Sequence, residues 1–197
     1  MLTALRRLSP VRAILVAFTS AAWVGVLLLM LPVSRQGPGG ASFMEAFFTA
    51  TSAICVTGLT IVDNEYYWTP FGQAVLMALM QIGGFGVMTL ATFVGYAVLG
   101  KLSLRSRLTA VAETHAAGPG DLTDVLGGIV KVTLVVEAAV ALSLTLRFWL
   151  AYDHSVGRAI WHGMFHAVSS FNNAGFALFS DNLTGFVDDP WICLPIA

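Results

Sequence analysis

Charged side chains are scarce in this chain. Asp, Glu, Lys and Arg make up 11% of its 197 residues, whereas hydrophobic residues make up 57% and the mean hydropathy is +0.79. Soluble domains carry about 25% charged residues. The composition therefore excludes an ordinary soluble domain and predicts an integral membrane protein whose surroundings are a lipid bilayer. The net charge of −1 at pH 7 gives no indication of nucleic-acid binding.

Cysteine is also rare, and this excludes a disulfide framework. The two cysteines, Cys55 and Cys193, are far apart in the sequence and both have apolar neighbours. They show neither the even, close spacing of a disulfide-rich domain nor the spacing of a zinc site. We expect both to be small buried side chains.

Two long stretches lack charge altogether. Residues 13–33 and 70–100 contain no Asp, Glu, Lys or Arg, and a helix of about 20 apolar residues can cross a bilayer. The first stretch follows basic residues, as in a signal peptide, but it is longer than a signal peptide's apolar region and no Ala-x-Ala site follows. It is predicted to be an uncleaved span. The Gly83-Gly84-Phe85-Gly86 cluster in the second predicts close helix contact rather than a ligand site.

A third membrane-length stretch, residues 125–150, does contain charges. Lys131 and Arg147 can lie near its two ends, but Glu137 lies well inside. A carboxylate within a span is costly and usually faces the interior of the helix bundle. We expect Glu137 to make an internal hydrogen bond or salt bridge.

The basic residues predict the orientation of the chain. Seven would lie on one side of the membrane, namely Arg6, Arg7, Arg12, Lys101, Arg105, Arg107 and Lys131, and three on the other, namely Arg35, Arg147 and Arg158. Cytoplasmic loops carry the excess of Lys and Arg, so the N-terminus is predicted to be cytoplasmic. Aromatic residues then gather at the outer interface: Tyr66, Tyr67, Trp68, Trp149, Tyr152 and Trp191.

One unusual sequence pattern occurs twice. Residues 48–58 read FTATSAICVTG and residues 165–175 read FHAVSSFNNAG. At an offset of 117 residues, Phe, Ala, Ser and Gly coincide without a gap. Each copy combines a short apolar helix with small or polar residues and a glycine, and each follows a membrane-length stretch. This order predicts a span, a half-buried helix, a filter strand and a further span.

The limits of the two short helices can be predicted from their capping residues. Ser42 and Glu45 form a capping-box pattern, so the first helix should begin at Ser42 and end near Ser52. The second should begin near Ser155 or Gly157 and end near Ser169. A helix of the first length is about 15 Å long, half the thickness of the bilayer core.

The residues after these helices suit a site for a dehydrated cation. Backbone carbonyls can replace the water shell of potassium, and glycine permits backbone angles that other residues avoid. The candidate residues are Val56, Thr57, Gly58 and Leu59 in the first copy and Asn172, Asn173, Ala174 and Gly175 in the second. Taken singly, each glycine could equally be an ordinary helix C-cap.

Three stretches give a specific family resemblance. Residues 51–60 (TSAICVTGLT), 81–86 (QIGGFG) and 165–176 (FHAVSSFNNAGF) resemble the first and second pore repeats of the Trk/Ktr/HKT potassium transport superfamily. The chain is most similar to the bacterial Ktr-type membrane subunit. The resemblance implies four span–pore helix–span repeats around one pore, with Gly58 and Gly175 as the first two filter glycines. A glycine at the first position resembles the potassium-selective pattern, whereas some plant relatives carry serine there and prefer sodium.

The resemblance also implies partners. The membrane subunit would form homodimers and bind a cytoplasmic nucleotide-binding regulatory subunit of the RCK/KTN type. Two of the four repeats are missing here, and with them the intramembrane gating loop of the third. Either the sequence is part of a longer protein, which we favour, or another membrane subunit completes the pore.

The sequence therefore predicts an all-α polytopic membrane protein built from potassium-channel-like repeated units. Residues 1–100 form the first repeat, 101–124 a cytoplasmic connector and 125–197 a second, incomplete repeat. The predicted function is potassium translocation across the bacterial plasma membrane, with no covalent cofactor and with sodium as an open alternative ion. The chain is not predicted to be an enzyme. The rival hypotheses are a membrane metalloenzyme using His162, His166 and Glu137, and a truncated partner subunit that does not transport.

Overall fold

The computed structural model describes residues 10–99, 122–152 and 155–197, and these residues are mostly helical. The longer elements are α2 (Pro10–Leu29), α3 (Phe43–Ile54), α5 (Pro70–Leu99), α7 (Leu122–Arg147) and α8 (Val156–Phe171). Short elements complete the described part: η1 (Pro32–Ser34), α4 (Asn64–Tyr67), the π-helical η2 (Phe148–Tyr152), η3 (Thr184–Phe186) and α9 (Pro190–Ile196). No strand element occurs in these ranges. The prediction of an all-α chain is confirmed to this extent.

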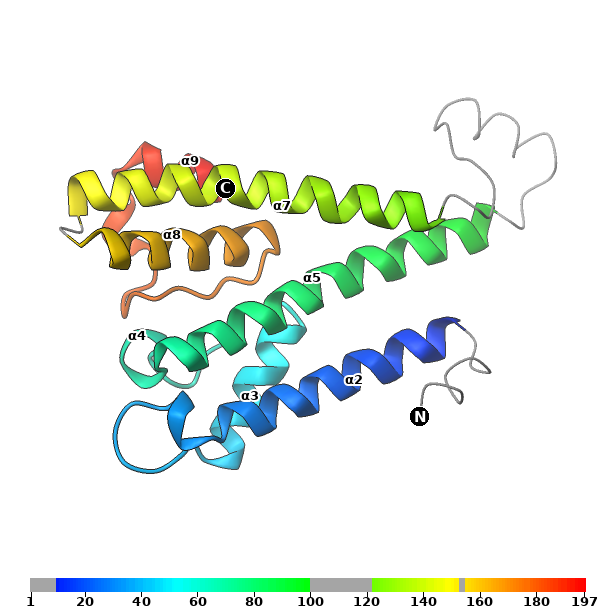
Figure 1. Ribbon diagram of the computed structural model, residues 1–197, viewed down its shortest axis with the longest axis horizontal. Coiled ribbons are helices and arrows are strands. Elements are labelled where there is room, and N and C mark those ends of the chain that lie inside the picture. Colours follow the sequence, from blue (N-terminus) through cyan, green and yellow to red (C-terminus); the bar gives the residue numbers. More distant parts are fainter. Residues whose placement is uncertain (1–9, 100–121, 153–154) are drawn as a thin grey trace.

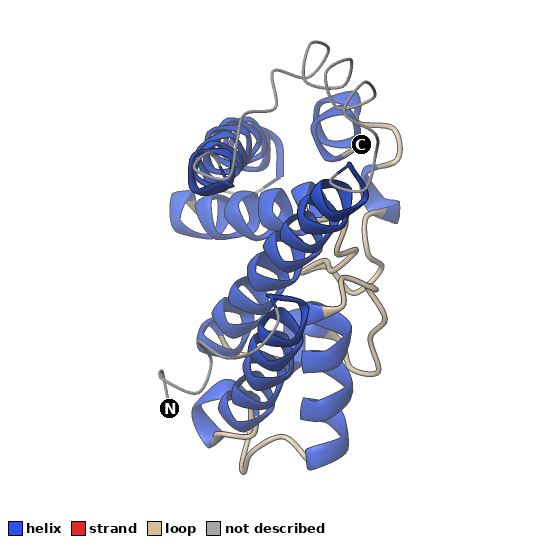
Figure 2. Cartoon of the chain, turned by 90° about the vertical axis from the view of Figure 1, so that its right-hand side faces the viewer, coloured by secondary structure: helices blue, strands red, loops and turns tan. Residues whose placement is uncertain are grey.

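The helices form two groups that meet along α5. In the first group α2 contacts α5 directly and α3 packs against both, and in the second α8 packs along α7, with α9 against α7. Figure 1 shows α5 crossing diagonally between α2 and the α7–α8 pair, and α5 also contacts α8. In Figure 2 the loops that follow the short helices lie between the two groups. The repeated pattern of the sequence therefore corresponds to two neighbouring helical groups.

Two described helices are long and apolar enough to cross a membrane. They are Pro70–Met88 within α5 and Gly127–Tyr152, which runs from α7 through η2. The described apolar part of α2, Leu15–Leu29, and α3 are shorter. The assignment of 13–33 as a first span stays a prediction. The connector predicted at 101–124 lies almost wholly outside the described residues, although α7 already begins at Leu122.

Helix α2 ends earlier than the uncharged stretch suggested. It stops at Leu29, and a 3-10 turn follows from Pro32 to Ser34. Pro32 has no N–H to continue the helix. At the end of α2 the Leu28 carbonyl accepts from the Leu31 N–H at 3.2 Å and from the Ser34 hydroxyl at 2.6 Å.

The main apolar core joins the two groups. It combines Leu29 of α2, Ile54 of α3, Leu76 and Met80 of α5 and Phe165 of α8. A smaller cluster around Phe148 and Leu144 lies between α7, α8 and the segment leading to α9. The core thus fixes α3 and α8, the two short helices that bear the candidate residues.

The structure differs from three expectations about side chains. Trp68, predicted to lie in an interfacial aromatic belt, is fully buried, because it packs edge-on against Tyr67 and lies over Gly72, and its level relative to a membrane stays a prediction. Cys55 and Cys193 are exposed rather than buried. Cys55 follows the last residue of α3, where the chain leaves the core, and Cys193 is an exposed residue of α9 whose thiol donates to the Phe186 carbonyl.

Candidate functional site: two matched turns after the short helices

Helix α3 begins with a complete capping box. The Ser42 N–H donates to Glu45 Oε2 at 2.8 Å, and the Glu45 N–H donates to Ser42 Oγ at 3.3 Å. The predicted start of this helix is confirmed, and its last residue is Ile54 rather than Ser52. Helix α8 runs from Val156 to Phe171, within two residues of both predicted limits, and its N-cap Ser155 makes no side-chain capping bond.

A tyrosine of α4 strengthens the start of α3. The Tyr67 hydroxyl donates to Glu45 Oε2 at 2.6 Å. This bond, together with those from Ser42, lowers the pKa of Glu45 to about 2. Burial, and then the bond to Glu45, raise the pKa of Tyr67 to about 12. Throughout the neutral pH range, Glu45 therefore stays ionised and Tyr67 keeps its phenol proton.

The two short helices end in the same turn. After α3, the N–H groups of residues 55, 56 and 57 donate to the carbonyls of residues 51, 53 and 52. After α8, the N–H groups of residues 172, 173 and 174 donate to the carbonyls of residues 168, 170 and 169. Each bond of the second set lies 117 residues after its counterpart, the offset of the sequence repeat. We call residues 55–59 the first turn segment and 172–176 the second turn segment.

The two turn segments also share an uncommon backbone. Val56 and Gly58 have φ angles of 56° and 70°, and the equivalent Asn173 and Gly175 have φ angles of 53° and 71°. A β-branched residue such as valine rarely adopts positive φ. Such strain persists only where the surrounding structure imposes it, and it clusters at functional sites.

The two glycines lie next to each other. A Cβ added to Gly58 would lie 2.7 Å from the Ala174 carbonyl oxygen and 3.1 Å from the Gly175 Cα. A Cβ added to Gly175 would lie 3.3 Å from the Gly58 Cα. The structure thus brings together two predicted site residues that are far apart in the sequence, and it leaves no room for a side chain between them.

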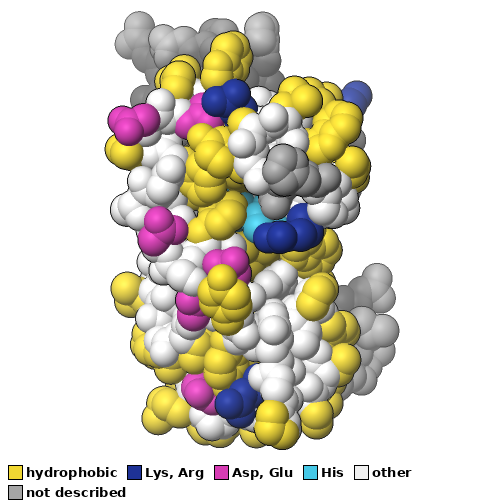
Figure 3. Space-filling model, turned by 90° about the vertical axis from the view of Figure 1, so that its left-hand side faces the viewer, with side chains coloured by type: hydrophobic (Ala, Val, Ile, Leu, Met, Phe, Trp, Pro, Cys, Tyr) yellow, Lys and Arg dark blue, Asp and Glu magenta, His cyan; other side chains and the backbone are white. Residues whose placement is uncertain are grey.

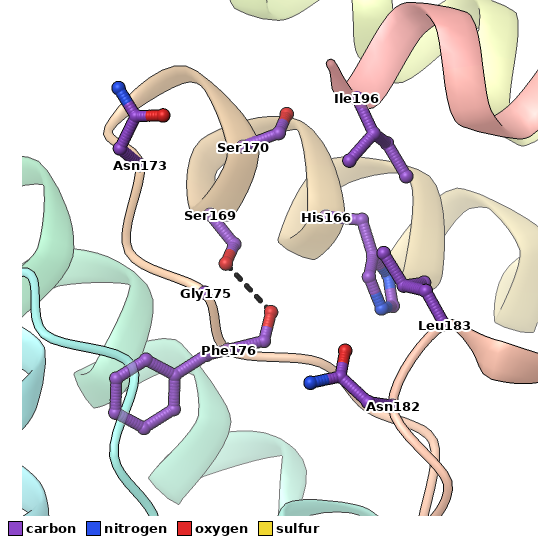
Figure 4. A pocket seen from close by; sticks show the side chains of 9 residues that line it. All are labelled: His166, Ser169, Ser170, Asn173, Gly175, Phe176, Asn182, Leu183 and Ile196. Atoms are coloured by element: carbon purple, nitrogen blue, oxygen red, sulfur yellow. Dashed lines mark hydrogen bonds between the residues drawn. The ribbon is translucent and has the colours of Figure 1, made fainter.

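Hydroxyl groups support each turn segment from inside. In the first, Ser52 Oγ and Thr57 Oγ1 share a hydrogen bond of 3.0 Å. In the second, Ser169 Oγ donates to the Phe176 carbonyl at 2.6 Å (Figure 4). The side chains of Thr57 and Leu59 are exposed, and so is that of Asn173. These three side chains therefore lie on a surface that no other described residue covers.

The side chain of Asn172, a predicted filter residue, lies in the interior of the protein. It is buried, and its amide donates to Gln81 of α5, to Glu137 of α7 and to the Val168 carbonyl. This side chain therefore holds the end of α8, and the place of Asn172 in a filter stays a prediction. The predicted internal hydrogen bond of Glu137 is confirmed, with Gln81 and Asn172 as partners. The sequence indicated this bond because Glu137 is a single carboxylate within an apolar helix. Such a carboxylate needs hydrogen-bond donors close to it.

The glycine cluster of α5 faces both turn segments. A Cβ on Gly83 would overlap the Ile54 carbonyl oxygen, and one on Gly84 would overlap the Asn172 side chain. A Cβ on Gly86 would lie 2.7 Å from the ring of Phe18. The prediction of tight helix packing at this cluster is confirmed.

A small cavity lies beside the second turn segment. It has a volume of about 200 Å³ and lies between Ser169, Gly175, Asn182 and Ile196, with His166 at its wall (Figure 4). His166 Nδ1 donates to the His162 carbonyl at 2.7 Å, and its Nε2 accepts from the Leu178 N–H at 3.3 Å. Both ring nitrogens are thus engaged within the protein. Among the described residues, no group of three His, Cys, Asp or Glu side chains is placed to hold a metal ion.

Acidic side chains lie at the end of the molecule where the segments that follow α3 and α8 meet. Figure 3 looks at this end and shows Asp and Glu side chains among hydrophobic ones. Asp63, Asp181 and Asp188 are exposed. Glu65, in contrast, accepts hydrogen bonds from the N–H and hydroxyl of Ser180, and so ties α4 of the first group to the loop before η3 in the second.

The described chain is thus an all-helical membrane protein in which two short helices end in matching turns that meet at two glycines. The family model of the TrkH cation transport protein matches residues 19–197. The chain belongs to this family and is a membrane subunit of the Trk/Ktr type. The family consists of transport proteins, which agrees with the prediction that the chain is not an enzyme.

Individual relatives support the same assignment. The chain is 37% identical over 190 residues to the Ktr system potassium uptake protein B of Bacillus subtilis, covering 96% of this chain and 42% of the relative. It is 40% identical over 186 residues to the protein of that name from Vibrio alginolyticus, covering 94% and 40%. It is 35% identical over 178 residues to the potassium/sodium uptake protein NtpJ of Enterococcus hirae, covering 90% and 39%. The chain therefore spans about two fifths of the length of the curated relatives it matches.

Proposed function

We propose that this chain provides two of the four filter segments of a potassium-translocating membrane subunit. The first turn segment would contribute carbonyls of Val56, Thr57, Gly58 and Leu59, and the second those of Asn173, Ala174 and Gly175, with Asn172 behind them. The observation that carries the proposal is the contact of Gly58 with Gly175 at the ends of two short helices that share one backbone geometry. The names of two relatives, potassium uptake proteins, support potassium as the ion.

The physical basis is desolvation. A potassium ion that leaves water needs a set of oxygens at fixed positions, and backbone carbonyls can provide it. Each short helix directs its C-terminal, partially negative end toward its turn segment. Positive φ angles at alternate residues, 56 and 58 or 173 and 175, turn the intervening peptide groups in a way that an ordinary strand does not. No covalent chemistry is involved.

Further protein segments would complete the pore and its assembly. The other filter segments come from further repeats of the same subunit or from another membrane subunit. The complete subunit forms a homodimer and binds a cytoplasmic nucleotide-binding regulatory subunit of the RCK/KTN type. It lies in the bacterial plasma membrane with its N-terminus in the cytoplasm, and the exposed Asp63, Asp181 and Asp188 face the outside. Acidic groups at this position raise the local cation concentration.

Growth of a bacterium that lacks its own potassium-uptake systems tests the function. At low external potassium, cells would express either the 197-residue chain or the chain extended through its natural reading frame. We expect rescue by the extended product, and rescue by the short chain would mean that separate chains assemble the pore. Failure of every form to restore growth, with normal abundance in the membrane, would overturn the proposal.

A further inference from the structure

A buried polar network joins three helices behind the second turn segment. The Glu137 side chain on α7 is 7% exposed. Gln81 Nε2 of α5 donates to its Oε2 at 3.2 Å, and Asn172 Nδ2 at the end of α8 donates to its Oε1 at 3.3 Å. Asn172 Nδ2 also lies 3.1 Å from Gln81 Oε1, so the three side chains close a ring.

The ring works in only one arrangement of its donors and acceptors. A carboxylate can only accept, so both neighbours must turn an amide NH₂ toward Glu137. Gln81 then has its oxygen left for Asn172, and Asn172 Nδ2 also reaches the Val168 carbonyl at 2.9 Å. The two hydrogens of this NH₂ group thus serve three acceptors, so one hydrogen is shared between two of them. Because the ring is buried, an unmatched donor within it would be costly. The carboxylate therefore determines how both amides are oriented.

The ring acts on the residue that starts the second turn segment. Asn172 is the C-cap of α8 and directly precedes Asn173, whose φ is 53°. Gly84 leaves the space that the Asn172 side chain occupies. The first turn segment has no counterpart: the positions 117 residues before Asn172 and Glu137 are Cys55 and Ser20, both exposed. There the Ser52–Thr57 bond supports the turn instead.

We propose that Glu137 is a positioning residue that, through Gln81 and Asn172, fixes the second turn segment in its ion-selecting geometry. This inference rests on the proposed potassium-translocating function. Glu137 does not contact the ion, because both its oxygens face amide donors of the ring. Its role is to hold the left-handed turn at Asn173 and Gly175 against relaxation, so that the oxygens there keep the spacing that favours potassium over sodium.

The matched set of variants is Glu137→Gln, Gln81→Glu and the double exchange Glu137→Gln with Gln81→Glu. In Glu137→Gln every flip state of the ring leaves one pair of like groups facing each other, either two amide NH₂ groups or two amide oxygens, and in Gln81→Glu two carboxylates face each other. In the double exchange the carboxylate moves to position 81 and accepts from the new amide at position 137 and from Asn172. The oxygen of that new amide is then left for Asn172. The ring is again complete, with unchanged composition and charge.

The measurement uses whichever form of the chain supports uptake. Potassium and sodium are each tested as inhibitors of rubidium uptake, and the ratio of their inhibitory strengths gives the potassium over sodium discrimination. The abundance of each variant in the membrane is measured in parallel. We expect each single variant to lower discrimination about ten-fold and the double exchange to restore most of it. Thr133→Val is the control, because Thr133 is buried one helical turn before Glu137 and outside the ring. It should leave discrimination unchanged.

Two outcomes would overturn the inference. In one, the single variants keep normal discrimination at normal abundance. In the other, the double exchange remains as defective as the single variants. Either result leaves the proposed function intact if Gly58→Ser still lowers discrimination in the same assay, whereas unchanged discrimination in Gly58→Ser would count against the filter assignment itself.

Discussion

At the residue scale, position 58 has both a backbone and a steric requirement. Its φ of 70° favours glycine, and any Cβ would lie 2.7 Å from the Ala174 carbonyl oxygen. The backbone requirement alone costs about 1–2 kcal/mol for another residue. The steric requirement has a different origin. An added Cβ would clash with a backbone carbonyl of the second turn segment, and this carbonyl can move only if that whole segment is displaced.

The variant Gly58→Ser should therefore lower potassium over sodium discrimination by displacing the Ala174 carbonyl. The matched control is Gly37→Ser, because Gly37 has a φ of 91° but no atom within 4 Å of an added Cβ. It carries a comparable backbone cost without the contact. Competition between potassium and sodium for rubidium uptake measures both. Equal effects of the two substitutions would show that backbone strain alone, rather than the contact with the second turn segment, matters.

At the element scale, the two short helices are anchored differently. Helix α3 begins with a capping box reinforced by Tyr67, whereas α8 begins at Ser155 without a side-chain capping bond. Helix α8 is held instead along its length and at its far end. Trp161 Nε1 donates to Gln73 Oε1 at 2.6 Å, and Asn172 joins the ring with Gln81 and Glu137.

This difference predicts unequal effects of removing the two N-cap serines. Ser42→Ala should lower the free energy of unfolding by about 1 kcal/mol, because it leaves the Glu45 N–H without its partner. Ser155→Ala should have little effect, because its hydroxyl caps no N–H of α8. Thermal unfolding in detergent, followed by loss of monodisperse protein, compares the two. A larger loss from Ser155→Ala would contradict this account of how the helices are anchored.

At the scale of the whole molecule, the two helical groups form one unit through contacts that cross between them. Asn64 Nδ2 donates to the Ala177 carbonyl at 3.4 Å, Glu65 accepts from Ser180, and Gly58 lies against Gly175. All three contacts involve the segments that follow the short helices, with Asn64 and Glu65 on α4. They lie at or toward the end of the molecule that the positive-inside pattern assigns to the outside.

The predicted orientation can be checked by labelling single cysteines in a background carrying Cys55→Ser and Cys193→Ser, since both native thiols are exposed. Tyr66→Cys lies on α4, which is predicted to face the outside and where Tyr66 is 66% exposed, and Ser103→Cys lies in the predicted cytoplasmic connector. A membrane-impermeant maleimide should label position 66 in intact cells and position 103 only after lysis. The reverse pattern would place the N-terminus outside. Growth rescue by each single-cysteine variant, made in the form of the chain that supports uptake, verifies that the variant is assembled correctly.

Sequence alone determined the class and the periodic features of this protein. Low charge and long apolar runs require a bilayer, the Ser42–Glu45 pair sets the start of α3, and the 117-residue offset predicted that Gly58 and Gly175 are equivalent. These features depend on the overall composition or on residues close together in the chain, and both can be read from the order of the residues. The family resemblance agreed with them because its motifs lie in the same stretches.

Only the tertiary structure decided which side chains meet. It placed Gly58 beside Gly175, buried Trp68, exposed both cysteines, and turned Asn172 inward to Gln81 and Glu137. Such contacts join residues up to 117 positions apart, and their partners depend on how α5 crosses α3, α7 and α8. A sequence shows that Glu137 needs donors within an apolar helix. The packing of three helices determines that the donors are two amides behind the second turn segment.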